Sequence, residues 1–279
     1  MTSASRLGVN LFLSLLFCAS AFSQQSFQYT TLQVPGSSQT FATAVNNNGD
    51  IVGYSESDGI ASGFLYTNGS FQTISPCPHG GVEPMGINDQ GVIVGTCNDG
   101  AFMYQNGNVT YLAYPKATAT FLTGINNEGV IVGGWQRGSS THSFAYSNGT
   151  FTAIGDNRLV GGINNSNTVS GTICNGKTDV CKGAVFFQDE DGWKTHKSVK
   201  YPGAAATVLG GINDNGDVVG FTGEPQDFVY NISSKTFTGF QVGSSVQSEA
   251  QGINNSGEIV GWYTNDGATF FGFYGQLSQ

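Results

Sequence analysis

One ten-residue motif occurs six times along the chain, and this repetition constrains the fold more than any other feature. The copies are AVNNNGDIVG (44–53), GINDQGVIVG (86–95), GINNEGVIVG (124–133), GINNSNTVSG (162–171), GINDNGDVVG (211–220) and GINNSGEIVG (252–261). The aliphatic residues at their second position are spaced by 42, 38, 38, 49 and 41 residues. A period near 40 residues indicates one supersecondary unit repeated along the chain.

Each copy predicts a tight β-hairpin. The segment Asn-(Asn/Asp)-x-Gly fits a type I turn closed by a left-handed residue, a position that Gly favours and Asn tolerates. Asn167 takes this position in the fourth copy. The glycine that ends every copy predicts a bulge or the close approach of another group. The stretch 213–217, NDNGD, resembles a calcium loop but lacks the spaced glutamate, so we interpret it as a turn and expect no metal site.

Every repeat offers four short strands, which we call A to D. The motif joins strands A and B, and turns such as Asn68-Gly69 join strands C and D. Four antiparallel strands per repeat are typical of a propeller blade. The sequence therefore predicts an all-β, six-bladed β-propeller; a β-solenoid is the alternative. The expected blades are 38–75, 80–114, 118–154, 158–201, 204–242 and 246–279.

The sixth repeat has no strand D, whereas residues 27–34 form a spare strand at the other end of the chain. We expect residues 27–34 to pair with 269–274 and to close the ring, because closure removes an exposed sheet edge.

Residues 1–23 have the features of a signal peptide: Arg6, an apolar core at 11–19 and small residues before the expected cleavage. The propeller then spans 24–279, and we expect a secreted protein, extracellular or periplasmic. The four remaining cysteines predict disulfides, because their number is even and their spacings fit no common zinc site. We expect Cys174–Cys181, which end strand B and begin strand C of one blade, and Cys77–Cys97, which both fall at the variable face.

The composition excludes several function classes. Charged residues make up 10% of the chain and the net charge is −9, which argues against nucleic-acid binding. Motifs of zinc proteases, nucleophile elbows and phosphate loops are absent from the sequence. We therefore assign no catalytic residue and expect no cofactor, no membrane insertion and a monomer.

The repeat resembles that of the HAF-type extracellular repeat proteins of bacteria, a family named for a His-Ala-Phe triplet. His142-Ser143-Phe144 is the nearest match here, and the other repeats mostly lack the His. Pro202-Gly203-Ala204 matches a segment that often precedes strand A in that family. The resemblance covers nearly all of the chain after residue 23. It implies export and a repeat architecture, and it transfers no catalytic residues.

The strand order places the A–B and C–D turns on one face of the propeller and the B–C and D–A loops on the other. The B–C and D–A loops vary in length, and variable loops on a rigid scaffold are where function usually lies. Aromatic residues follow the strand-B glycine unevenly, and we expect them to bind the ligand: Tyr54, Trp135, Phe221, Trp262 and Tyr263. The alternative is that these rings pack between blades.

These features favour a non-catalytic binding protein that presents its variable face to a glycan or a cell-surface protein. The first alternative is a glycoside hydrolase or lyase that uses carboxylates of the B–C loops. The candidates are Glu56, Asp58, Asp99, Glu224 and Asp266. The second alternative is a structural surface protein.

Overall fold

The repeated motif forms a hairpin in all six copies of the computed structural model, which describes residues 23–278 except 25, 157 and 175–179. In the first copy, the Asn46 side-chain oxygen accepts hydrogen bonds from the N–H groups of Asn48 and Asp50, at 3.0 and 2.9 Å. Gly49 has a φ of 81°, and Asn167, its counterpart in the fourth copy, has a φ of 57°. The turn prediction is confirmed.

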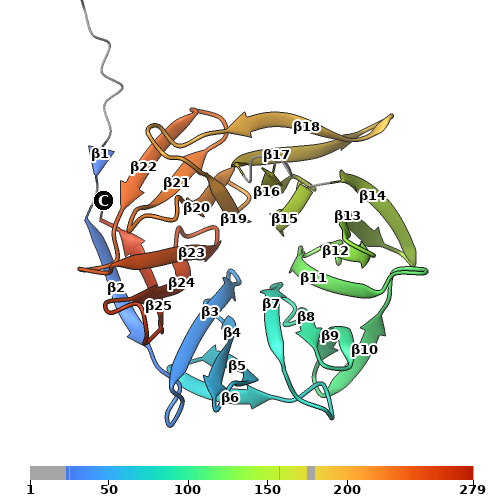
Figure 1. Cartoon of the computed structure of the whole chain (residues 1–279), viewed down its shortest axis with the longest axis horizontal. Coiled ribbons are helices and arrows are strands. Elements are labelled where there is room, and N and C mark those ends of the chain that lie inside the picture. The colour runs from blue at the N-terminus through green and yellow to red at the C-terminus, as the bar shows by residue number, and fades with distance from the viewer. Residues whose placement is uncertain (1–22, 25, 157, 175–179, 279) are drawn as a thin grey trace, which may run out of the picture.

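The hairpins belong to six blades arranged as a ring (Figure 1). Blades 1 to 3 follow one another in the chain. Blade 1 contains β3 (Gln39–Val45), β4 (Ile51–Ser57), β5 (Ile60–Thr67) and β6 (Ser70–Ile74). Blade 2 contains β7 (Glu83–Ile87), β8 (Ile93–Cys97), β9 (Gly100–Gln105) and β10 (Asn108–Leu112). Blade 3 contains β11 (Ala119–Ile125), β12 (Ile131–Arg137), β13 (Ser140–Ser147) and β14 (Thr150–Asp156).

The remaining blades complete the ring. Blade 4 contains β15 (Arg158–Ile163), β16 (Val169–Cys174), β17 (Cys181–Asp189) and β18 (Gly192–Val199). Blade 5 contains β19 (Val208–Ile212), β20 (Asp217–Phe221), β21 (Asp227–Asn231) and β22 (Thr236–Phe240). Blade 6 contains β23 (Gln247–Ile253), β24 (Ile259–Thr264), β25 (Phe271–Leu277) and β2 (Phe27–Leu32). The six-bladed propeller is confirmed, and the solenoid alternative is wrong.

The N-terminal strand closes the ring as the sequence predicted. Strand β2 pairs antiparallel with β25, with Thr31 opposite Phe273. A short additional strand, β1 (Ser23–Gln24), pairs in parallel with β22 at the outer edge of blade 5. No helix in the described part of the chain is long and apolar enough to cross a bilayer.

Glycine at the end of each motif is required by a bulge in strand A. The register shifts between Ala42 and Ala44 in blade 1, and at the corresponding place in every other blade. A Cβ at Gly53 would lie 2.0 Å from the Phe41 carbonyl oxygen and 2.8 Å from the ring of Phe64. Any larger residue at this position would therefore collide with strand A.

The hydrophobic core lies between the blades. Strand-C phenylalanines opposite the motif glycines are almost fully buried: Phe64, Phe102, Phe144, Phe228 and Phe273. In blade 4 the residue opposite Gly171 is Ala184 instead. One core cluster joins Val52 of blade 1 to Ile87 and Phe102 of blade 2, which shows how neighbouring blades share one core.

The first asparagine of each motif joins its blade to the next one. Its side-chain nitrogen donates a hydrogen bond to the main-chain oxygen of the equivalent asparagine, at 3.0–3.2 Å, and the six bonds close a circle. All six side chains are buried: Asn46, Asn88, Asn126, Asn164, Asn213 and Asn254. The residue after each of these asparagines forms a second circle. We call the two circles together the asparagine collar.

The second residue of the turn forms the other circle of the collar. Each main-chain N–H donates to the side-chain oxygen of the equivalent residue in the next blade, at 2.8 Å in all six cases. Asp89 also accepts from the side-chain amides of Asn47 and Asn127, at 2.9 and 2.6 Å. Burial raises the pKa of Asp89, but these hydrogen bonds outweigh it and the pKa is lowered. Asp214 accepts in the same way from Asn165 and Asn255.

Both predicted disulfides are present. Cys174 and Cys181 lie opposite each other in β16 and β17, with their Cα atoms 4.1 Å apart. Cys77 and Cys97 join the loop before blade 2 to the end of β8, with a Cα separation of 6.5 Å.

Replacing a collar asparagine should destabilise the whole ring. Asn126→Ala removes the donor to Asn164 and the acceptor for the N–H groups of Glu128 and Val130. We expect a loss of about 3 kcal/mol or more, because each buried polar group left unpaired costs about 1–3 kcal/mol. Urea unfolding measures this, with the exposed Asn108→Ala as control. Equal stability of the two variants would contradict the role of the collar.

Candidate functional site

A cavity of about 300 Å³ lies on the axis of the propeller. The inner strands of all six blades line it, mainly with glycine, aliphatic and threonine residues. The aliphatic residues of the repeated motifs, from Val45 to Ile253, line the cavity and also border the asparagine collar. The collar therefore lies at one end of the cavity, on the face of the A–B turns.

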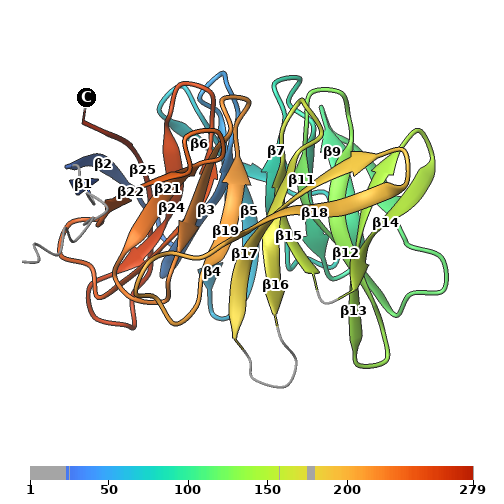
Figure 2. The same ribbon diagram turned by 90° about the horizontal axis from the view of Figure 1, so that it is seen from above.

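The variable face lies at the opposite end of the strands. Figure 2 shows the propeller from the side, with the A–B hairpins at the upper edge and the β12–β13 connection extending from the lower edge. Leu159, Val208, Phe221 and the Cys174–Cys181 disulfide line the cavity toward this lower face. Leu159 is 47% exposed, which is unusual for a large aliphatic residue beside a cavity.

One position of strand A lies toward this face in every blade, and in blades 4 and 5 it lines the cavity. It lies five residues before the collar asparagine and pairs with a residue of strand B in each blade. These six pairs, which we call the rim, are Phe41–Tyr54, Glu83–Thr96, Phe121–Gly134, Leu159–Thr172, Val208–Phe221 and Glu249–Trp262. Unlike the collar, the rim changes its chemistry from blade to blade.

Aromatic rings gather where blade 1 meets blade 6. The ring of Phe41 stacks on Tyr54 with centroids 4.9 Å apart and meets Trp262 edge-on at 5.9 Å. Phe270 lies 5.6 Å from Phe41 and 5.3 Å from Trp262. All four rings are partly exposed, so they can contact a ligand as well as each other.

The charges of three carboxylates act on Tyr54. Burial, followed by the charges of Glu83, Glu56 and Glu249, raises the pKa of Tyr54 to about 12. Burial also raises the pKa of Glu83, and the charge of Glu56 adds to this effect. Burial raises the pKa of Glu249 to about 7, although Gln251 donates a hydrogen bond to its carboxylate at 2.9 Å.

The aromatic residues chosen from the sequence do not form one site. Tyr54, Phe221 and Trp262 belong to the rim. Trp135 and Tyr263 lie one residue further along strand B and therefore point to the opposite face of their blades. Whether any of the five binds a ligand stays a prediction.

These last two aromatic residues have other partners. Trp135 stacks between Tyr114 and His142, with centroid distances of 4.4 and 4.1 Å. Tyr263 is 6% exposed and shares a hydrogen bond of 2.8 Å with Thr31 of the closing strand. Packing between strands is the role that the structure gives Tyr263.

The loop carboxylates chosen from the sequence also lie apart. Only Glu56 joins the group around Tyr54. Asp58 has a φ of 53° in the β4–β5 turn, and Glu224 is exposed. Asp266 accepts hydrogen bonds from the N–H groups of Thr269 and Ala268, which lower its pKa to about 2. The two missed carboxylates, Glu83 and Glu249, lie in strand A rather than in a loop.

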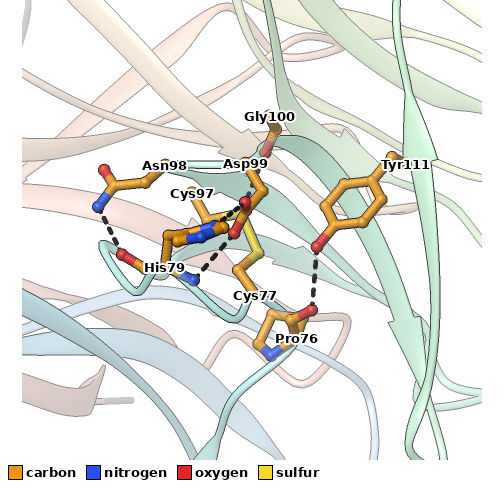
Figure 3. Close-up of a disulfide and its surroundings, with 8 residues drawn as sticks. All are labelled: Pro76, Cys77, His79, Cys97, Asn98, Asp99, Gly100 and Tyr111. Carbon is orange, nitrogen blue, oxygen red and sulfur yellow. Dashed lines mark hydrogen bonds and ion pairs between the residues drawn. A yellow bond between two sulfur atoms is a disulfide. The ribbon is translucent and has the colours of Figure 1, made fainter.

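The fifth loop carboxylate, Asp99, lies beside the Cys77–Cys97 disulfide (Figure 3). It pairs with the ring of His79 at 2.5 Å and accepts from the His79 N–H at 3.1 Å. The hydrogen bond from the His79 ring lowers the pKa of Asp99. The two sulfur atoms and Asp99 lie close enough for a metal, but the disulfide removes both thiolates as ligands.

No protein-family model matches the chain, and no curated protein matches its sequence significantly. Solved structures do match its fold. One is a catalytically inactive virginiamycin B lyase from Staphylococcus aureus with quinupristin, at 12% identity and a TM-score of 0.53. Another is the selenomethionine-substituted form of that lyase, at 13% identity and the same TM-score. Each match covers 90% of this chain and 100% of the lyase. At such low identity the likeness extends to the fold alone.

Two buried carboxyls should make the stability depend on pH. Asp227 is fully buried between blades 5 and 6, and burial raises its pKa to about 7 from an ordinary 3.8. Glu249 shifts in the same direction. Because the folded state holds these protons more tightly than the unfolded state, the stabilisation is complete near pH 4 and is lost as the pH rises through 7.

We expect the free energy of unfolding to fall between pH 4 and 7, by at most about 1.4 kcal/mol per pH unit for each carboxyl. Asp227→Asn should reduce this slope and stabilise the protein at pH 8. Urea unfolding at several pH values measures both effects, with the exposed Glu224→Gln as control. An unchanged slope in Asp227→Asn would contradict the prediction.

Proposed function

We propose that the protein is an exported, non-catalytic binding propeller that holds a glycan in the cavity on its variable face. The observation that supports this most is the group of aromatic rings at the rim where blades 6 and 1 meet, with Glu249 opposite Trp262. This group lies on the same face as the rim residues of blades 4 and 5 that line a cavity of about 300 Å³. Aromatic rings pack against the apolar faces of sugars, and carboxylates accept hydrogen bonds from their hydroxyl groups. A concave site lined in this way suits a small ligand or a chain end better than a flat protein surface.

Export is part of the same proposal. The proposed signal peptide lies almost wholly outside the described residues, so it stays a prediction from the sequence. The two disulfides support an oxidising compartment, which fits both extracellular and periplasmic locations. A cell-surface protein remains the alternative partner.

A hydrolase or lyase is the second candidate function, and the rim carboxylates favour it. Glu83 and Glu249 have raised pKa values, as a carboxyl must to act as a general acid near neutral pH. The lyase structures show that an enzyme can have this fold, but their likeness to this chain carries no residue across. Turnover of a bound glycan would support this candidate, and Glu83→Gln or Glu249→Gln should then abolish turnover while the glycan remains bound.

Two tryptophan variants test the location of the site. Trp262→Ala removes a ring of the rim, whereas Trp135→Ala removes a ring that stacks on the opposite face of blade 3. Both truncations should lower the melting temperature, because both rings are partly buried. Binding to a glycan panel, measured by calorimetry well below both melting temperatures, should weaken by about tenfold in Trp262→Ala only.

Equal losses of affinity in the two variants would contradict the rim as the binding site. A panel in which no glycan binds the wild-type protein would contradict the proposed function itself.

A further inference from the structure

Positive charge is distributed very unevenly around the ring. Blades 6, 1 and 2, including the closing strand, are built from residues 246–279 and 27–115. These two segments contain nine Asp and Glu residues and no Lys or Arg. The rest of the ring, 116–245, contains nine Lys and Arg residues against ten Asp and Glu. Nearly all of the net charge of −9 therefore comes from one contiguous half of the propeller.

The acidic part of the rim lies at the centre of that half. Glu249 lies opposite Trp262 in blade 6, and Glu56 follows Tyr54 by two residues in β4. The charges of Glu56, Glu83 and Glu249 all raise the pKa of Tyr54. Among the described residues, ion pairs involve only His79, His142 and Lys194, and none of them reaches these glutamates. Glu56 and Glu249 are partly buried and Glu83 is exposed. Partly buried carboxylates without a cation are costly, so a positively charged group brought by a ligand would be stabilised here.

The neighbouring rings suit the same kind of group. The ring of Phe41 contacts the rings of Tyr54 and Trp262, and Glu249 lies opposite Trp262. The faces of aromatic rings attract cations, and tryptophan does so most strongly. Rings and carboxylates together bind an ammonium group, whereas rings alone would bind a neutral sugar equally well.

The rim of blades 4 and 5 has a different character. Leu159, Val208 and Phe221 belong to it and line the cavity without a charged group between them. A ligand that spans the cavity would therefore place its charged end toward blades 6, 1 and 2 and an apolar surface toward blades 4 and 5.

We propose that the glycan held by the rim carries free amino groups, as glucosamine units do, and that its ammonium groups bind between Glu83, Glu249 and the rings of Phe41 and Trp262. This inference rests on the proposed function, because it specifies the ligand of the same site. The acidic half of the ring would also attract such a ligand over a longer range and speed its association at low salt.

A matched pair of oligosaccharides tests the charge alone. A β-1,4-linked glucosamine oligomer and its N-acetylated counterpart have the same backbone and differ in whether the nitrogen is charged. By calorimetry, we expect the glucosamine oligomer to bind at least about tenfold more tightly, and we expect added salt to weaken its binding. Equal affinities, or tighter binding of the N-acetylated oligomer, would overturn the proposal and leave glycan binding in place. Failure of both oligomers and of a wider panel would overturn both.

Variants locate the charge that is responsible. Glu83→Gln and Glu249→Gln should each weaken glucosamine binding, and the double variant should remove most of the preference over the N-acetylated oligomer. Glu128→Gln is the matched control, because Glu128 is exposed in an A–B turn on the opposite face. Melting curves confirm folding. A folded double variant with an unchanged preference would overturn the proposal, and if it fails to fold, the salt dependence of the wild-type protein decides.

Discussion

The hydrogen bond from each collar asparagine to its neighbour is the interaction on which the rest of the structure depends. The buried side-chain amide of a turn asparagine donates this hydrogen bond to the main-chain oxygen of the equivalent asparagine in the next blade. The same side chain holds its own turn through its oxygen. Each asparagine thus stabilises its own turn and also joins its blade to the next one, and the six asparagines form a closed circle. The inner strands are thereby held close enough that glycine is required where they meet, as between Gly86 and Gly124.

This arrangement separates the two faces of the propeller. On the face of the A–B turns, every repeat supplies the same asparagine and the same turn, because each asparagine bonds to the one in the next blade. On the other side of the bulge, strand A makes no collar hydrogen bonds. The rim position there is occupied by residues as different as Phe41, Glu83 and Leu159. Chemical variety is therefore possible only at the end of the strands that faces the variable loops.

Much of the fold could be predicted because the ten-residue motif recurs at a nearly regular spacing along the chain. The spacing of the motif indicated the blades, the missing last strand indicated the closure, and cysteine position indicated both disulfides. The collar was not predicted, because asparagine in a turn is fully explained by local bonds and nothing local reveals a partner about 40 residues away. The site was predicted only in part. Trp262 and Tyr263 are adjacent in sequence, but successive side chains of a strand point to opposite faces. Trp262 therefore lies at the rim and Tyr263 is buried in the core. Glu249 was not predicted, because it lies within strand A and nothing in the local sequence shows that it faces Trp262.

The central claim is that the collar end of the ring is structural and the rim end binds the ligand. The most direct measurement is a crystal structure of the protein soaked with a glucosamine oligomer. We expect electron density for the sugar on the variable face, packed on Phe41 and Trp262, with a nitrogen atom within hydrogen-bond distance of Glu83 or Glu249. Sugar bound at the asparagine collar, or on the outer strands with the cavity unoccupied, would contradict it.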